Sequence, residues 1–412
     1  MNNIFSPADI LLPSFINEPQ KAEKWAVVAC DQFTSEPEYW DSAYSFVGNS
    51  ESTLNMILPE AFLSTQNDCT LSKIASCMEE YKNSVLTCHE NSLIYIRRTQ
   101  SDGKIRCGIV GKIDLEAYDY SVGSTSAVRA TEGTVLERIP PRVAVRRGAT
   151  VELPHIMLLI DDAKKSIIEP LADQCELMEK LYDFDLMLGG GHIVGYKLNK
   201  LQADEVLNGF SDLFSASTVG IKFAVGDGNH SLASAKARYE EIKKEIGEER
   251  AKAHPLRYAL CEVVNLHDEA LVFEPIYRFV KTSDPDALVC ALEKYGKECD
   301  KGNQSVKCIW RGKETILSLG NGAHSLTVGT LQKFLDEYKK NNPDIEIDYI
   351  HGMDSILKLS GAAGSVGFVF EGMKKEELFS SVEKDGALPR KTFSMGEARD
   401  KRYYIECRNI AQ

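Results

Sequence analysis

"IKFAVGDGNHSLASAKARYEE", residues 221–241, joins an alternating apolar segment to a segment with helical spacing. Ile221, Phe223 and Val225 alternate as in a β-strand. The apolar residues that follow recur at intervals of three and four, as in an amphipathic helix: Leu232, Ala235, Tyr239, Ile242 and Ile246. The sequence therefore predicts a strand followed by a helix, with a hinge at residues 226–231.

The hinge has a backbone suited to an anion. Gly226 and Gly228 allow conformations closed to other residues and let a ligand approach the amides, and Asn229 or Ser231 can cap the helix. The first N–H groups of a helix have no partner within it and lie at the positive end of its dipole. We therefore expect a phosphate-binding site that uses these four residues.

Two ionisable side chains flank this predicted site. Asp227 is expected to hold Mg²⁺ or to orient a nucleophile, and His230 to donate to a phosphate or to move a proton near neutral pH. The same residues are also common in turns and helix caps, so a plain turn without a ligand stays open. The hinge matches neither G-x-x-x-x-G-K-[ST] nor G-x-G-x-x-G.

The composition limits the classes of protein to consider. A chain of 412 residues exceeds the size of one core, so about two domains are expected. The 48 Lys and Arg against 61 Asp and Glu give a net charge of -13, which argues against nucleic acid as a partner. No apolar stretch approaches the roughly 18 residues of a membrane-spanning helix, and no signal peptide is evident. We expect a cytoplasmic protein without membrane contacts.

The cysteines and histidines do not form a known ligand pattern. The 11 cysteines include no C-x-x-C pair, and the 8 histidines include no H-E-x-x-H. We therefore predict reduced thiols and no structural metal.

Two further segments carry local signals. The stretch 91–119 consists of two alternating segments joined across Asp102 and Gly103, which predicts a β-hairpin with a two-residue turn. The stretch 128–148 concentrates positive charge in an acidic chain: Arg129, Arg138, Arg142, Arg146 and Arg147. Arginines can clamp phosphate or carboxylate groups but serve equally in ion pairs, and both interpretations stay open.

At these residues the chain resembles a known family. The stretch 196–239 is similar to the helix, strand and Asp-Gly-His-His-Arg hinge of the domain of unknown function 1015 family of bacteria and archaea. Three more segments resemble the family's motifs: "TEGTVLERIPPRV" through Glu132, Thr134 and Arg142; "LHDEALVFEPIYRFV" through Asp268, Leu271, Pro275 and Arg278; and "GALPRKTF" through Gly386, Pro389, Lys391 and Thr392. Four ordered similarities thus run from the arginine-rich segment to near the C-terminus.

The hinge also resembles that of the ParB and sulfiredoxin superfamily, which includes nucleotidases and an ADP-dependent free serine kinase. In those relatives the loop and helix start bind nucleotide phosphates. The resemblance implies a ParB/sulfiredoxin-like core in the N-terminal portion. From the order of the segments we expect a mixed α/β fold with an N-terminal portion, residues 1–257, and a second α/β portion, residues 258–412. The resemblance also implies ATP or ADP with Mg²⁺ as the ligand.

The chain departs from the family pattern at the hinge. Asn229 replaces the first histidine of Asp-Gly-His-His-Arg, and Ser231 replaces its arginine. We infer that the missing positive charge comes from Arg129, Arg142, Arg278 or Lys391. Such exchanges indicate a divergent subgroup, with an altered substrate or without catalysis.

Two functions from different classes follow. The first is an ATP- or ADP-dependent small-molecule kinase or nucleotide hydrolase, with Asp227, His230 and Glu132 as catalytic residues and Mg²⁺ held by Asp227 or Glu132. The alternative is a regulatory protein that binds a nucleotide or phosphorylated metabolite without catalysis. A homo-oligomer stays open.

Overall fold

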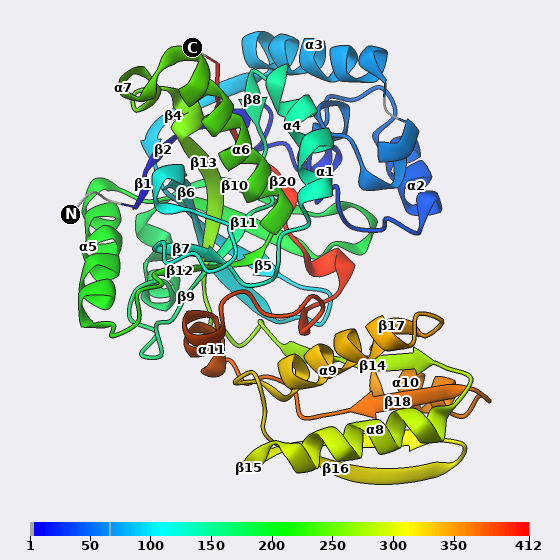
Figure 1. Cartoon of the computed structure of the whole chain (residues 1–412). Coiled ribbons are helices and arrows are strands. Elements are labelled where there is room, and N and C mark those ends of the chain that lie inside the picture. Colours follow the sequence, from blue (N-terminus) through cyan, green and yellow to red (C-terminus); the bar gives the residue numbers. More distant parts are fainter. Residues whose placement is uncertain (1–3, 66, 412) are drawn as a thin grey trace. The chain divides into compact units, whose positions relative to one another are not determined.

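The computed structural model describes residues 4–65 and 67–411 and divides into two compact units (Figure 1). Unit 1 comprises Met1–Ala130, Thr134–Leu271 and Glu397–Gln412. Unit 2 comprises Thr131–Gly133 and Val272–Gly396. The mixed α/β class predicted from the sequence is confirmed in both units. The ParB/sulfiredoxin-like core stays a prediction.

Unit 1 is built on a nine-stranded sheet. Its main order is β10 (Glu179–Asp185), β11 (His192–Lys197), β5 (Ile94–Thr99), β6 (Ile105–Asp114), β13 (Tyr258–Asn265), β9 (Met157–Ile160), β12 (Phe223–Asp227) and β7 (Val128–Ala130), and β1 (Phe5–Ser6) pairs with β6. β12 runs parallel to β7, with Phe223 opposite Val128. The carboxyl ends of these two strands therefore meet at one edge of the sheet.

Two smaller sheets of unit 1 join the ends of the chain. One has the order β4 (Leu86–Ser92), β2 (Ala8–Pro13), β21 (Cys407–Asn409) and β8 (Val151–Glu152), and the other pairs β20 (Tyr403–Tyr404) with β3 (Val27–Val28). The C-terminal segment thus returns to strands near the N-terminus.

Helices cover the sheets of unit 1. They are α1 (Pro19–Trp25), α2 (Pro37–Val47), α3 (Asp68–Ser84), α4 (Ile139–Arg147), α5 (Lys200–Ala216), α6 (Asn229–Ile246) and α7 (Glu248–Ala251). Short 3₁₀ turns are η1 (Thr53–Met56), η2 (Glu60–Thr65), η3 (Leu115–Ala117), η4 (Leu136–Arg138), η5 (Glu169–Leu177), η6 (Met187–Gly189), η7 (Pro255–Arg257) and η8 (Ala398–Asp400). α4 packs against α6 (Figure 1). This contact brings the arginine-rich segment to the helix of the hinge.

Unit 2 contains a six-stranded sheet. Its order is β16 (Lys313–Asn321), β15 (Asp300–Trp310), β18 (Ser365–Val369), β14 (Phe273–Lys281) and β17 (Glu346–His351), and β19 (Phe393–Met395) pairs with β14. Its helices are α8 (Pro285–Glu298), α9 (Thr327–Asn341), α10 (Met353–Ser360) and α11 (Glu377–Asp385).

Several local predictions can be compared with these elements. The hairpin is confirmed as β5 and β6, but its loop is longer than the predicted two-residue turn. Gln100 N donates to Lys104 O over 2.8 Å, and only Gly103 of the predicted turn pair has a positive φ, of 83°. β13 lies beyond the predicted domain boundary at residue 257 and pairs with β6 and β9 of unit 1. The division into domains 1–257 and 258–412 stays a prediction.

Within the two described ranges, no helix is both long and apolar enough to cross a membrane.

Candidate functional site

The predicted hinge is a one-residue turn between β12 and α6. β12 ends at Asp227, α6 begins at Asn229, and Gly228 between them has φ 78° and ψ 27°. No side chain caps the helix, and the Oδ1 atom of Asp227 accepts a hydrogen bond from Gly228 N over 3.0 Å. The prediction that Asn229 or Ser231 caps the helix is therefore wrong, because both residues already lie inside its first turn.

The two glycines of the hinge serve different purposes. A Cβ atom on Gly228 would lie 3.0 Å from His155 O and 3.0 Å from Ile156 Cα, and the residue is also left-handed. Gly226 has no positive φ, but a Cβ atom there would lie 2.8 Å from the Leu159 side chain of β9. The expectation of an unusual backbone at Gly226 is thus wrong, since close packing between strands explains that glycine.

Asp227 pairs with a lysine from the returning C-terminal segment. Lys401 Nζ lies 3.6 Å from Asp227 Oδ2, and the two side chains are 15% and 17% exposed. The pair places a positive charge beside the start of α6. Lys401 could not be predicted from the sequence, because it lies 174 positions from Asp227 and its own surroundings carry no motif.

His230 is engaged within unit 1. Its Nε2 atom accepts a hydrogen bond from Val135 N over 3.2 Å, and Ser234 Oγ donates to His230 O over 2.6 Å. A neutral ring that accepts at Nε2 carries its proton at Nδ1. His230 therefore fixes the segment before α4 to the first turn of α6.

A second histidine lies directly beside the hinge. His155 Nδ1 is 2.6 Å from Tyr404 OH, and His155 Nε2 is 4.0 Å from Asp31 Oδ2. Cys30 N donates to Tyr404 OH over 3.1 Å. Burial raises the pKa of Tyr404 well above its ordinary value, so its phenol stays neutral. These contacts orient the imidazole with Nε2 toward a carboxylate.

Asp31 stands among positive charges. Burial acts to raise its pKa, but His155, a hydrogen bond from Gln32, and then Lys401 and Arg142 lower it, and the net pKa is below the ordinary value. Asp31 is thus a carboxylate at neutral pH. The sequence carries one local signal for Asp31. It follows the apolar run of "WAVVACDQF", residues 25–33, where the pattern predicts that a strand ends in a polar turn.

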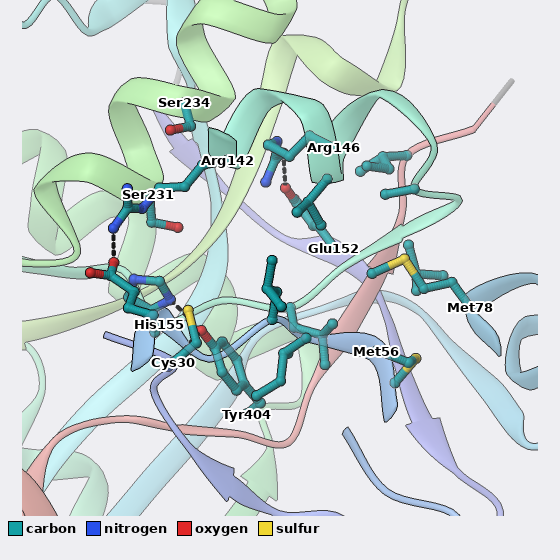
Figure 2. Close-up of a pocket in the computed structure, with 18 of the residues that line it drawn as sticks. Cys30, Met56, Met78, Arg142, Arg146, Glu152, His155, Ser231, Ser234 and Tyr404 are labelled. Atoms are coloured by element: carbon teal, nitrogen blue, oxygen red, sulfur yellow. Dashed lines mark hydrogen bonds and ion pairs between the residues drawn. The ribbon is translucent and has the colours of Figure 1, made fainter. Parts of the chain in front are cut away.

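A cavity of about 110 Å³ lies in unit 1 next to these groups. Figure 2 shows Ser231, Arg142 and His155 on one side of it and Met56 and Met78 on the other. Arg142 forms an ion pair with Glu60, and this pair belongs to the wall. Ser231, a predicted ligand of phosphate, therefore lies both at the start of α6 and at the edge of a cavity.

Arg129 is buried in β7 of unit 1. Its Nε atom donates to Ser126 O over 2.8 Å and its Nη2 atom to Thr125 O over 3.2 Å. These bonds secure the loop before β7.

The other three predicted residues come together in unit 2. The backbone of Glu132 forms an isolated parallel β-bridge with that of Leu388. The fully buried Arg278 donates to Lys391 O over 2.9 Å and to Arg390 O over 3.2 Å. Burial lowers the pKa of Arg278 to about 10, against the opposing effects of Tyr349 and Glu132. Lys391 is exposed and has φ 57°. The predicted site residues thus form two groups, one in each unit.

Among residues 4–65 and 67–411, no group of three or more His, Cys, Asp or Glu side chains is arranged to hold a metal ion.

Comparison with known proteins gave a family and several similar structures. The model of the family described as "Protein of unknown function (DUF1015)" matches residues 15–343. No curated protein matches. A variant of free serine kinase in complex with AMP is 12% identical, with a TM-score of 0.39 over 71% of this chain and 90% of that chain.

Two further structures cover a similar share of this chain. Another free serine kinase variant, in complex with ADP, is 12% identical, with a TM-score of 0.39 over 73% of this chain and 92% of that chain. A conserved hypothetical protein from Pyrococcus furiosus is 13% identical, with a TM-score of 0.35 over 71% of this chain and 97% of that chain. The two nucleotides are ligands of the kinase structures.

Proposed function

This chain belongs to the DUF1015 family, and from the geometry of its hinge we propose that unit 1 binds the phosphates of a nucleotide and transfers a phosphoryl group to a small molecule. The observation that carries the proposal is the uncapped start of α6 beside the pair of Asp227 and Lys401. Amides without a capping side chain and a neighbouring ammonium group are both suited to phosphate oxygens.

The length of α6 and the residues at its start support this proposal. The helix has 18 residues, so its N-terminus carries the full partial charge of a helix dipole. Its first turn contains no acidic residue that would repel an anion. The left-handed Gly228 lets the chain pass from β12 directly into α6, so no further residue lies between the strand and the first amides of the helix.

The residues present fit a magnesium ion that accompanies a nucleotide. Mg²⁺ keeps several waters and uses one or two carboxylates together with substrate phosphates, and Asp227 would supply such a carboxylate. When bound, the ion neutralises charge that develops on the transferring phosphoryl group.

The groups beside the hinge suit the transfer itself. The oxygen of an acceptor hydroxyl bonds to the terminal phosphorus while the bond from that phosphorus to its bridging oxygen breaks. The shortened nucleotide leaves with the electron pair of that bond. His155 in its neutral form, with its proton at Nδ1 toward Tyr404 OH, takes the proton of the hydroxyl at Nε2, and the carboxylate of Asp31, 4.0 Å away, stabilises the resulting cation.

One observation favours the non-catalytic alternative. His230 accepts from Val135 and Arg142 is paired with Glu60, so two predicted site residues already hold the protein together. A regulatory protein that binds a nucleotide would need only the cradle at α6.

The test is thermal unfolding with ATP, ADP, AMP or pyrophosphate, each with and without Mg²⁺. Wild type should gain stability with at least one nucleotide, by about 2.7 kcal/mol at a hundredfold excess over Kd. Asp227→Asn should lose the part of the gain that depends on Mg²⁺. Lys401→Met should weaken binding both with and without the ion, and Asp204→Asn, an exposed acid on α5, serves as the control.

Two outcomes would contradict parts of the proposal. If Asp227→Asn binds nucleotide more tightly without Mg²⁺ and keeps the effect of the ion, Asp227 only neutralises Lys401 and holds no metal. If wild type gains no stability with any of these ligands, the phosphate site does not exist. Binding without turnover of any acceptor would support the regulatory alternative.

A further inference from the structure

The cavity beside the hinge points to the chemistry of the acceptor. We propose that it takes the aliphatic body of a small alcohol, a chain of about four or five carbons, and holds the hydroxyl of this alcohol at Ser231. The inference rests on the proposed function, since it assigns the acceptor for the same hinge.

The size of the cavity selects the length of the chain. Its volume is about 110 Å³. An apolar cavity of about 150 Å³ accommodates benzene, with six carbons, so about four or five carbons fit here. Adenine, with ten non-hydrogen atoms, exceeds this space. The cavity therefore suits the acceptor better than the base of the nucleotide.

The lining of the cavity is mostly apolar. Buried side chains from different parts of unit 1 form its wall, among them Met56 of η1, Met78 of α3, Val151 of β8 and Ile410. Figure 2 shows Met56 and Met78 on the side away from Ser231. Methionines adapt to the shape of an apolar group, and burial of each methylene contributes about 0.8 kcal/mol in transfer free energy.

Charges on the wall are already neutralised. Arg142 pairs with Glu60, and Arg146 Nη2 lies 2.5 Å from Glu152 Oε2. Glu152 also receives a bond from Arg408. An ammonium group on the ligand would find both carboxylates occupied by guanidinium groups. The Nε atom of Arg146 has no hydrogen-bond partner among the described residues and can donate to a hydroxyl oxygen, so an uncharged polar group matches this wall.

Ser231 supplies the polar contact. It is the third residue of α6 and lines the cavity, and its hydroxyl has no hydrogen-bond partner among the described residues. An alcohol held there would lie at the helix start that cradles the phosphate. His155 also lines the cavity, and in the proposed transfer it takes the proton of this hydroxyl.

The test follows binding of plain alcohols by NMR of isotope-labelled methionine methyl groups, assigned with Met56→Leu and Met78→Leu. Isopentyl alcohol should shift the signals of Met56 and Met78, and glycerol should not. Affinity should rise about fourfold per carbon from ethanol to isopentyl alcohol and fall for octanol. Ala149→Leu should block the cavity, because Ala149 lines it.

Ala149→Leu adds bulk to the interior and could impair folding, so a second variant without added bulk provides an independent test. Ser231→Ala preserves the volume, so it should still bind the methyl ether of isopentyl alcohol but lose the preference for the alcohol. The inference is overturned if isopentyl alcohol leaves both methionine signals unshifted, or if glycerol shifts them equally. Thermal shift with nucleotide on the same sample reports separately whether the phosphate site exists.

Discussion

At the scale of single residues, Gly228 decides whether the hinge can form. Its left-handed conformation turns the chain from β12 into α6 without a linker. Its missing Cβ atom lets the turn lie against the backbone of His155 and Ile156. One atom of side chain would therefore disturb both the backbone conformation of the turn and its packing against the segment before β9.

Gly228→Ala should consequently lower the free energy of unfolding more than Gly103→Ala does. Gly103 has φ 83°, and a Cβ atom there would contact nothing within 4 Å. Gly103→Ala should therefore cost only the left-handed strain, about 1–2 kcal/mol. Gly228→Ala should exceed this cost and abolish stabilisation by nucleotide, as measured by urea unfolding with and without ligand. Equal costs for the two variants would show that the close approach at Gly228 has no energetic consequence.

The sequence revealed only part of the candidate site at this scale. Asp227 and Gly228 stand in one short stretch, so local spacing was enough to predict the hinge. His155 and Tyr404 are 249 positions apart and meet only through the pairing of strands. Lys401 likewise reaches Asp227 from the last segment of the chain. No single-sequence pattern carries such contacts.

At the scale of elements, η7 depends on a buried histidine. His254 is its N-cap residue, and the Nδ1 atom accepts a hydrogen bond from Leu256 N over 3.1 Å. A protonated imidazole cannot accept this bond. Burial, followed by the nearby charge of Arg238, lowers the pKa of His254 below its ordinary value of 6.5.

The stability of unit 1 should therefore fall when the pH drops below about 6.5, where the unfolded chain begins to bind a proton that the folded chain does not. The contribution of His254 is fully present above that pH and is lost as the pH falls through the lower pKa of the folded state. His254→Asn retains an acceptor for the cap and does not titrate. Its urea midpoint should decline less than that of wild type between about pH 7 and pH 5. An identical decline in both proteins would contradict the role of His254.

Elements with strong periodicity were predicted correctly. The stretch 221–241 formed β12 and most of α6, with the side chains of Leu232 and Tyr239 buried as their helical spacing predicts. The hairpin of β5 and β6 also formed, but its loop lengthened because only Gly103 adopts the left-handed conformation. Periodicity thus predicts an element, whereas the detailed geometry of a turn depends on each residue in it.

At the scale of the whole molecule, the C-terminal segment completes unit 1. β20 pairs with β3 and β21 pairs with β2, so the last residues join strands from the beginning of the chain. The length of the chain predicted about two domains, and two compact units are present. The return of residues 397–412 could not be predicted, because it depends on pairing between distant strands and changes no local pattern.

A buried arginine secures this return. Arg402 forms ion pairs with Glu262 of β13 and with Glu406, and its Nε atom donates to Pro154 O over 3.2 Å. Both glutamates are 1% exposed. Tyr182 donates a further hydrogen bond to Glu406. Removing the guanidinium would thus take its ion pair from buried Glu406 and would leave buried Glu262 with Arg106 alone.

Arg402→Met should therefore lower the free energy of unfolding by about 3–5 kcal/mol, because an uncompensated buried charge costs more than the pair contributed. Urea unfolding at neutral pH measures the change. Arg147→Met is the matched control, since Arg147 forms an exposed pair with Glu241 and its loss should leave the midpoint nearly unchanged. If the two variants unfold at the same urea concentration, the buried network does not hold the C-terminal segment. If only Arg402→Met loses stability, the contact between Arg402 and Glu262, which are 140 positions apart in the sequence, holds the segment that carries Lys401.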